Sequence, residues 1–321
     1  MYKRQLLRSA VVVTTCIGAG RLRQLLAAPP SAGKGGGDGA LGGAAARFRT
    51  VLIDEATQSV EPASLVPLLY GCEQLVLVGD QKQLPPTVTS RDAEKGGLAL
   101  SLFDRLQAAG VAPLLLRRQY RMHPALAEVV SRQSYDGKVT SAVEAADRPP
   151  PAGVRWPSAA CPVLFENVVG PEAARDEATG SIANRREAAA AVEAVRAVLA
   201  AGELRGADVG VIAMYAAQVR LIQTALGRLP AVLGAAAVEV SSVDGFQGRE
   251  KELIVISTVR SNPDGELGFV RDARRMNVAI SRARRGLVVC GDAATLGGDP
   301  GWRRYLQWLR RKRCVVGEAE S

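Results

Sequence analysis

Histidine is nearly missing from this sequence, and cysteine is scarce and scattered. His123 is the single histidine among 321 residues, so no histidine-based metal cluster can form, and a Ser-His-Asp hydrolase would depend on this one residue. No two cysteines form a C-x-x-C pair, which argues against a zinc site and against a disulfide scaffold. Chemistry of the protease or esterase kind is therefore disfavoured. The five cysteines, expected to be reduced thiols in the core, are Cys16, Cys72, Cys161, Cys290 and Cys314.

Long hydrophobic runs are also missing. No apolar stretch reaches the roughly 18 residues that a membrane-spanning helix requires. The N-terminal stretch MYKRQLLRSAVVVTTC continues into a strand-like segment and shows no signal-peptide cleavage site. We therefore expect a soluble intracellular protein without a membrane partner. We place it in the cytoplasm, although nothing in the sequence separates cytoplasm from nucleus.

Positive charge is in excess. The 41 Lys and Arg residues outnumber the 32 Asp and Glu residues, which gives a net charge of +9 and a pI near 9.6. Such a surface favours a partner that carries phosphate, nucleic acid above all, although basic proteins also bind polyanions without specificity.

Short apolar runs rich in β-branched residues alternate with longer amphipathic segments, a pattern typical of a parallel sheet flanked by helices. Because the apolar runs are continuous, we expect burial on both faces of the sheet. The expected strands are residues 10–16, 50–55, 74–80, 209–214, 252–259 and 286–292. The expected helices are residues 101–110, 124–135, 184–202 and 215–229. The fold class is therefore α/β.

Two segments interrupt this alternation. Residues 27–46 are rich in Gly and Ala and too poor in large apolar residues to pack, so we predict a flexible surface insertion. Residues 147–162 are rich in proline and predict an irregular connection in or beside a second domain. We expect the boundary between two domains near Arg117, where the chain leaves LLLR and enters RQYRMHP.

Adjacent carboxylates end one of the expected strands. Asp54 and Glu55 follow the apolar run VLI, and in open α/β sheets ligands lie beyond the carboxyl ends of the strands. One carboxylate, Asp54, can hold hydrated Mg²⁺ while Glu55 orients an attacking water, as phosphoryl transfer requires. A charged strand end that caps a helix is the alternative for an isolated pair of this kind.

The next expected strand, LVLVGD, breaks into a polar loop that contains Gln83. A glutamine here can hydrogen-bond a terminal phosphate or the attacking water, and Pro85 and Pro86 stiffen the loop. An ordinary exit from a strand into a turn explains the same residues equally well.

Five motifs in a fixed order extend this pattern. They are DEATQ (54–58), GDQKQLPP (79–86), RRQYRMHPAL (117–126), VEVSSVDGFQGREKELIVISTVRSN (238–262) and RRMNVAISRARRGLVVCGD (274–292). Together they resemble the ordered motifs of superfamily 1B helicases, the group that includes the RNA helicase of nonsense-mediated mRNA decay. TTCIGAG (14–20) is similar to a nucleic-acid-contacting motif of the same group. The resemblance covers nearly the whole chain except the Gly/Ala-rich segment and the extreme termini.

The resemblance implies roles for residues that would face ATP and Mg²⁺. Tyr120 would stack on adenine, Arg121 and Arg282 would act as arginine fingers, and the guanidinium fork suits a phosphate clamp. Arg282 is expected on a helix. Gln247, Gly248 and Glu250 would contact the nucleotide. Any one arginine, taken alone, is more often a solvated charge.

Other residues match positions at which the family contacts nucleic acid. They are Thr14, Thr15, Pro85, Ser241, Ser242 and Asp244. Trp302 and Trp308 could stack on bases, but their six-residue separation suits packing of a terminal helix better. His123 is expected to form a hydrogen bond at the start of a helix. For Gln218 we expect at most a position near the nucleotide.

The phosphate-gripping loop of such motors is not found. The pattern G-x-x-x-x-G-K-S/T does not occur in the chain, and neither Gly33-Lys34 nor Gly137-Lys138 satisfies it. In the family this loop precedes the region that corresponds to our first residues, so we expect a truncation. Residues 1–117 would be the C-terminal part of a first RecA-like domain, and residues 118–321 a second RecA-like domain.

The expected function is an ATP-hydrolysing, monomeric helicase motor that moves 5′ to 3′ on single-stranded RNA or DNA. The resemblance also implies partners among mRNA-surveillance proteins. Two alternatives stay open, namely a nucleic-acid-binding module without catalysis and a DNA-repair helicase. For this chain alone we expect little or no ATP hydrolysis because the phosphate loop is absent.

Overall fold

The structure, a computed structural model, describes residues 9–22, 47–158, 160–173 and 179–318. The chain divides into two compact units, Met1–Leu114 and Leu115–Ser321, whereas the sequence placed the boundary after Arg117. The insertion expected at residues 27–46 lies outside the described residues. Among the described residues, no helix is long and apolar enough to cross a membrane.

The first unit contains a small parallel sheet. Strands β1 (Thr50–Ile53) and β2 (Gln74–Leu77) pair in register from Thr50 with Gln74 to Ile53 with Leu77. The other elements described here are α2 (Cys16–Ala19), η1 (Ala56–Gln58), α4 (Glu61–Leu65), η2 (Val66–Tyr70), α5 (Arg91–Lys95) and α6 (Leu102–Ala108). Both strands and α6 were expected from the sequence.

Two expectations for the first unit are wrong. Residues 11–15 form no strand, because no described strand lies beside them to complete a hydrogen-bond ladder, and Val11 and Val13 are exposed. β1 and β2 are not buried on both faces either, since Leu52 is 64% exposed and Val76 is 43% exposed. Among the described residues, one face of this small sheet has no covering element.

The second unit is built on a six-stranded sheet in the order β10-β5-β9-β8-β6-β7, with every neighbouring pair parallel. This confirms the expected α/β class with a parallel sheet. The strands are β5 (Val163–Asn167), β6 (Val209–Ala213), β7 (Glu239–Ser242), β8 (Lys251–Ser257), β9 (Ala283–Gly291) and β10 (Val315–Val316). A separate two-stranded parallel sheet pairs β3 (Arg118–Gln119) with β4 (Thr140–Ser141).

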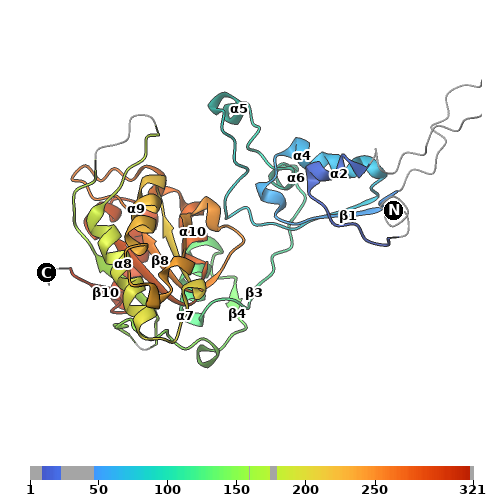
Figure 1. Cartoon of the computed structure of the whole chain (residues 1–321). Coiled ribbons are helices and arrows are strands. Elements are labelled where there is room, and N and C mark those ends of the chain that lie inside the picture. Colours follow the sequence, from blue (N-terminus) through green and yellow to red (C-terminus); the bar gives the residue numbers. More distant parts are fainter. Residues whose placement is uncertain (1–8, 23–46, 159, 174–178, 319–321) are drawn as a thin grey trace, which may run out of the picture. The chain divides into compact units, whose positions relative to one another are not determined.

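Helices cover both faces of the six-stranded sheet. On one face α8 (Arg185–Ala200) and α9 (Ala216–Leu226) bury Val211, Val255 and Val288. The other face is also closed, because Ile254 and Ile256 are fully buried. Figure 1 shows α7 (Pro124–Ser134) and α10 (Ala273–Ile280) on the side of β8 away from α8 and α9.

Two more helices follow the last long strand, namely α11 (Ala293–Leu296) and α12 (Pro300–Arg311). Helix α12 packs against α7, and its apolar side is buried in the core. Trp302 and Trp308 are 1% and 4% exposed, and the Trp302 indole N–H donates to the Val270 carbonyl at 2.8 Å. The two tryptophans therefore pack in the core, as their spacing predicted, and are not available to stack on bases.

Candidate functional site

Asp54 and Glu55 lie directly beyond the carboxyl end of β1. Both are exposed, and one Asp54 carboxylate oxygen accepts the Glu55 backbone N–H at 2.9 Å. Glu55 has a left-handed backbone, with φ 50° and ψ 39°, a conformation that costs a residue with a side chain about 1–2 kcal/mol. Strain of this kind tends to persist where function needs it. The neighbouring Gln58 amide donates to the Glu55 carboxylate at 2.6 Å and fixes its orientation.

The loop after β2 lies at the same edge of the small sheet. The Gln83 amide donates to Asp80 at 2.8 Å, and the other Asp80 oxygen accepts the Lys82 backbone N–H at 2.9 Å. The Thr57 hydroxyl bridges the two strand ends through the Asp80 backbone at 3.3 Å. Gly79 permits this approach, since a Cβ there would lie 3.0 Å from Thr57 atoms. The structure thus brings Asp54, Glu55 and Gln83 to one edge.

The donor set at this edge is compatible with Mg²⁺ and too small for a protein-only metal cage. Among the described residues no group of three or more His, Cys, Asp or Glu side chains could hold a metal ion. Mg²⁺ commonly keeps several waters and takes one or two carboxylates together with substrate phosphates. The exposed Asp54 carboxylate fits that requirement.

The residues of the first unit that match nucleic-acid-contacting positions lie apart from one another in the chain. Thr14 and Thr15 are exposed, and the Thr15 hydroxyl caps α2 by accepting the Gly18 N–H at 3.0 Å. Pro85 is half-buried in the loop that carries Gln83. The helix cap explains Thr15 without a ligand, so its contact with nucleic acid stays a prediction.

In the second unit, Arg121 meets the segment that precedes β8. Its guanidinium forms an ion pair with Glu250 and donates to the Ser281 carbonyl at 3.2 Å. Its side chain is one-third exposed, whereas the neighbouring Tyr120 is 65% exposed. The structure therefore gathers Arg121, Glu250 and the chain before Arg282 at the starts of β8 and β9.

Arg282 departs from two expectations. It lies in the turn after α10 and not on the helix. Its guanidinium is buried, and it donates to the Val278 carbonyl at 3.1 Å, to the Ser281 hydroxyl at 2.9 Å and to the Arg249 carbonyl at 3.4 Å. Five donors on one rigid plane can satisfy several acceptors at once. In this conformation the side chain can reach a phosphate only by leaving these acceptors.

Arg284 and Arg285, the two arginines that follow Ala283, both form ion pairs. Arg284 lies 3.3 Å from Glu252 and 3.7 Å from Glu250. Arg285 forms an ion pair with Glu203 and donates to the Pro149 carbonyl at 2.6 Å. The sequence does not reveal these pairs because each carboxylate lies far away along the chain.

Gln119 and Arg148 position the loop that carries Tyr120 and Arg121, and sequence analysis missed both. The Gln119 amide oxygen accepts the N–H groups of Arg121 at 2.9 Å and Met122 at 2.7 Å. The Arg148 guanidinium donates to the carbonyls of Arg121 at 3.0 Å and Tyr120 at 3.2 Å. Gln119 stands inside a recognised motif, but no signal in the sequence marks Arg148.

Replacing Gln119 by alanine should loosen this loop. The two backbone N–H groups of Arg121 and Met122 lose their acceptor, so we expect their amide hydrogen exchange to accelerate about tenfold. Exchange followed by NMR checks this. Gln107→Ala, at an exposed position of α6, is the control and should leave both rates unchanged. Equal rates in all three proteins would show that Gln119 does not hold the loop.

The segment from Ser241 to Glu250 runs between opposite edges of the sheet. Ser242 pairs with Ala213, which on its other side pairs with Ser257, at the carboxyl edge, whereas Glu250 precedes the start of β8. Asp244 pairs with Arg275 at 3.4 Å. The predicted nucleic-acid contacts Ser241, Ser242 and Asp244 therefore lie at one edge, and Gln247, Gly248 and Glu250 approach the other.

Gln247 carries an unsatisfied donor. Its amide nitrogen is buried and has no hydrogen-bond partner among the described residues, an arrangement that is rare in folded proteins. Gly248 follows with a left-handed φ of 74°. A nucleotide oxygen could accept from the Gln247 amide, and contact of Gln247 and Gly248 with a nucleotide stays a prediction.

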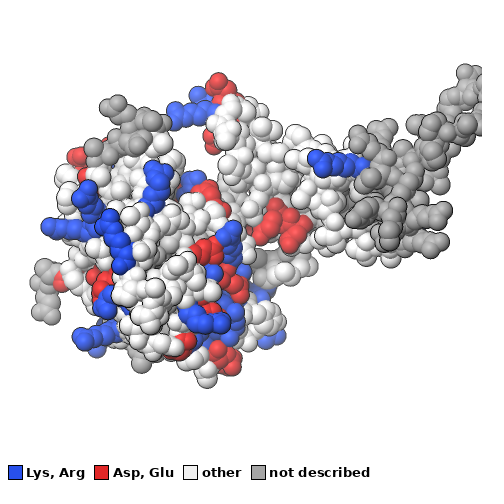
Figure 2. All heavy atoms as spheres, viewed as in Figure 1, with Lys and Arg blue, Asp and Glu red and all other residues white. Residues whose placement is uncertain are grey.

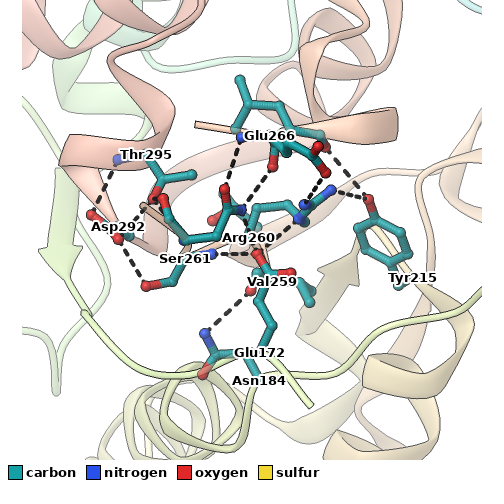
Figure 3. Close-up of polar contacts among 12 residues, drawn as sticks. Glu172, Asn184, Tyr215, Val259, Arg260, Ser261, Glu266, Asp292 and Thr295 are labelled. Atoms are coloured by element: carbon teal, nitrogen blue, oxygen red, sulfur yellow. Dashed lines mark hydrogen bonds and ion pairs between the residues drawn. The ribbon is translucent and has the colours of Figure 1, made fainter. Parts of the chain in front are cut away.

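A polar network occupies the carboxyl ends of β8 and β9 (Figure 3). Glu172 accepts from Arg260 at 2.8 Å and from the Ser261 N–H at 2.9 Å, and the Ser261 hydroxyl donates to Asp292 at 2.8 Å. Burial alone would raise the pKa of Glu172, but hydrogen bonds from Arg260, Asn262 and Ser261 outweigh it and lower the pKa below its ordinary value. The loop after β8 is thus firmly held.

Val259, the residue before Arg260, has a left-handed backbone with φ 75°, a rare conformation for a β-branched residue. Buried side chains hold it in place. Glu187 accepts the Val259 N–H at 2.6 Å, and the Asn184 amide donates to the Val259 carbonyl at 3.2 Å, as Figure 3 shows for Asn184. The backbone is therefore fixed from both sides.

Gln218 belongs to the same buried network. Its amide bonds to both backbone groups of Asn184, at 2.8 and 3.0 Å, and to the Ser257 hydroxyl at 2.9 Å. It is fully buried, so a structural role replaces the suggested role near the nucleotide. His123 behaves as expected, since its ring nitrogen accepts the Ala125 N–H at 3.1 Å at the start of α7.

Two family models, both described as AAA domain, match residues 1–91 and 98–294. The chain therefore belongs to this AAA domain family. Its curated relatives include the "Regulator of nonsense transcripts 1 homolog" of Neurospora crassa, 40% identical over 320 residues, which are 98% of this chain and 27% of that protein. The resemblance predicted from the ordered motifs is thereby confirmed.

Two further relatives carry different names. The "ATP-dependent helicase NAM7" of Saccharomyces cerevisiae is 37% identical over 313 residues, covering 96% of this chain and 30% of that protein. The "5'-3' DNA helicase ZGRF1" of Mus musculus is 38% identical over 267 residues, covering 81% of this chain and 14% of that protein. The chain spans less than a third of the length of each of these relatives.

Proposed function

We propose that this chain contributes the acidic and arginine-bearing parts of an ATP-hydrolysing motor that moves on single-stranded nucleic acid. The arrangement beyond β1 and β2 carries the proposal, because the strained Glu55, the neighbouring Asp54 and the Gln83 loop share one edge. The named helicases among its relatives support it. We also propose that this motor acts in mRNA surveillance in the cytoplasm, together with other proteins of that process.

Each side chain has a chemical task in this mechanism. Asp54 would hold hydrated Mg²⁺, which neutralises phosphate charge when bound. Glu55 would orient and deprotonate the attacking water. Tyr120 is exposed enough to stack on adenine. Arg121 can exchange its pairing with Glu250 for a phosphate, and Arg282 would have to leave its present acceptors to do the same.

The test is a fusion that supplies a phosphate loop. A segment with the sequence G-x-x-x-x-G-K-S/T, taken from a helicase of the family, is joined to the N-terminus and ATP turnover is measured with single-stranded RNA. We expect RNA-stimulated turnover, and Glu55→Gln should lower kcat at least a hundredfold. Glu73→Gln, which removes an exposed partner of Arg49, is the matched control. If Glu55→Gln leaves ATP turnover unchanged, the catalytic role assigned to Glu55 is refuted.

A DNA-directed motor is the second candidate, favoured by the similarity to the mouse DNA helicase. Comparing RNA and DNA as activators of the same fusion separates the two. Equal or stronger stimulation by single-stranded DNA would contradict a role in mRNA surveillance. A fusion that binds nucleic acid but never hydrolyses ATP would support a binding module without catalysis.

A further inference from the structure

Helix α12 is strongly amphipathic, with one apolar side and one basic side. Its buried side consists of Trp302, Tyr305, Leu306, Trp308 and Leu309. Its exposed side carries the α12 arginine face, which we define as Arg303, Arg304, Arg310 and Arg311. At 3.6 residues per turn these four arginines lie within about 120° of the helix circumference. No acidic residue occurs between Pro300 and Gly317.

Carboxylates neutralise only part of this charge. Arg310 is held by Glu318 at 2.6 and 3.0 Å, and Lys312 by Glu128 at 3.2 Å. For Arg304 and Arg311, the described part of the chain supplies no carboxylate within ion-pair distance. Arg303 donates to the backbone carbonyls of Gly297 and Gly298 and keeps its full charge.

We propose that the α12 arginine face binds the phosphate backbone of single-stranded nucleic acid, as a second contact region of the motor proposed above. Arginine is the side chain best suited to bind phosphate with two parallel hydrogen bonds. Arg304 and Arg311 are separated by two helical turns, about 10 Å along the axis.

The composition of the face selects this partner over two others. Protein interfaces depend on apolar or aromatic anchors, and none of the exposed large hydrophobic residues in the described chain lies on α12. A membrane surface would need the apolar side of an amphipathic helix, but Trp302, Trp308 and Leu309 are buried in the core. A charged face without anchors suits a backbone that is bound without regard to sequence.

The strand that follows the face and the strand that carries the predicted contacts Ser241 and Ser242 are the two edge strands of the sheet. Helix α12 leads directly into β10, which forms one end of the six-stranded sheet, whereas β7 with these serines forms the other end. Five strand spacings separate the two ends, about 24 Å. The α12 arginine face belongs to a different element from the predicted contacts, which lie on β7.

The test measures binding of a 20-nucleotide single-stranded oligouridylate to the 321-residue chain at several salt concentrations. The variant R304E/R311E should bind at least tenfold more weakly at 0.1 M salt. The slope of log affinity against log salt should fall by about 1.4, since two phosphate contacts are lost at roughly 0.7 each.

The matched control is R220E/R228E, which makes the same charge change at two exposed arginines on and just after α9. Figure 2 shows the face of the second unit that carries α8 and α9, where Lys and Arg side chains are spread among uncharged ones. The control should weaken binding less and leave the slope within about 0.3 of the unchanged chain's slope. Equal losses in both variants, or an unchanged slope in R304E/R311E, would overturn the proposal.

Two further measurements distinguish failure of this proposal from failure of the proposed function. Ser241→Ala removes an uncharged contact, so it should reduce affinity without changing the salt slope. Loss with Ser241→Ala but not with R304E/R311E would refute the α12 inference and keep the nucleic-acid function. No binding by the unchanged chain would refute both. Competition by polyglutamate as strong as that by RNA would show that the face binds acidic polymers in general.

Discussion

The 321-residue chain should hydrolyse ATP no faster than background, with or without single-stranded RNA. It contains no G-x-x-x-x-G-K-S/T sequence, and in motors of this class the backbone N–H groups and lysine of that loop hold the phosphates. Loss of one such donor typically costs two to three orders of magnitude in kcat. Loss of the whole loop should therefore suppress turnover at least about a thousandfold relative to the fusion described above.

A coupled assay of phosphate release checks this, with Glu55→Gln as the control for contaminating enzymes. Any turnover that survives Glu55→Gln is foreign to the chain. Turnover that depends on Glu55 without an added phosphate loop would show that other residues grip the phosphates. Direct titration with ATP should likewise show weak binding, and tight binding would contradict the prediction.

Replacing Glu187 by alanine should destabilise the second unit by about 3–5 kcal/mol, because two buried donors lose their acceptor and a third, the Thr258 hydroxyl, keeps only the Cys290 carbonyl. Those donors are the Val259 N–H at 2.6 Å, the Ser257 hydroxyl at 2.7 Å and the Thr258 hydroxyl at 3.4 Å. Urea unfolding at pH 7 measures the loss. Glu187→Gln keeps the shape and an acceptor oxygen, so it should cost much less. Equal costs would show that the acceptor oxygens do not matter.

The pH dependence of this effect has a definite sign. Burial raises the pKa of Glu187 from 4.5 to about 8, although hydrogen bonds from Val259, Ser257 and Thr258 lower it in part. Between these two values the folded chain binds more protons than the unfolded chain, so the contribution of Glu187 to stability falls as pH rises. It is fully present below pH 4.5 and lost above pH 8.

Comparing the unchanged chain with Glu187→Gln isolates this contribution from that of other groups. From pH 5 to pH 8.5 the unfolding free energy of the unchanged chain should fall relative to that of Glu187→Gln. A difference independent of pH would show that Glu187 stays ionised in the folded chain. The strained Val259 would then be held by a buried carboxylate rather than by a carboxylic acid.

The strands that the sequence predicted best are those buried on both faces. The buried parts of β6, β8 and β9 match continuous apolar runs, because a strand segment covered by helices on both sides must be apolar. β9 begins at Ala283, before the expected start at residue 286, and its added residues Arg284 and Arg285 are only half-buried. Residues 10–16 have the same composition but form no strand. Strand propensity is realised only where a neighbouring strand supplies hydrogen bonds, and the sequence does not say where neighbours lie.

Contacts between residues far apart in the sequence could not be predicted from local sequence patterns. Arg121 forms an ion pair with Glu250, and Arg285 forms one with Glu203. Both pairs depend on the order in which the strands are arranged in the sheet. The motif match brought Arg121, Glu250 and Arg282 into one group, but it did not reveal that Arg282 is buried against backbone carbonyls. Arg148 lies outside every motif, so only the fold connects it with Tyr120.

Gly210 in β6 ties the sheet to the segment between Ser241 and Glu250. A Cβ at this position would lie 2.6 Å from the ring of Phe246, so the missing side chain leaves a recess that the fully buried phenyl group fills. A ring seated in a recess resists sliding. The segment is thereby anchored at Phe246, between Ser242 at one edge of the sheet and Glu250 at the other.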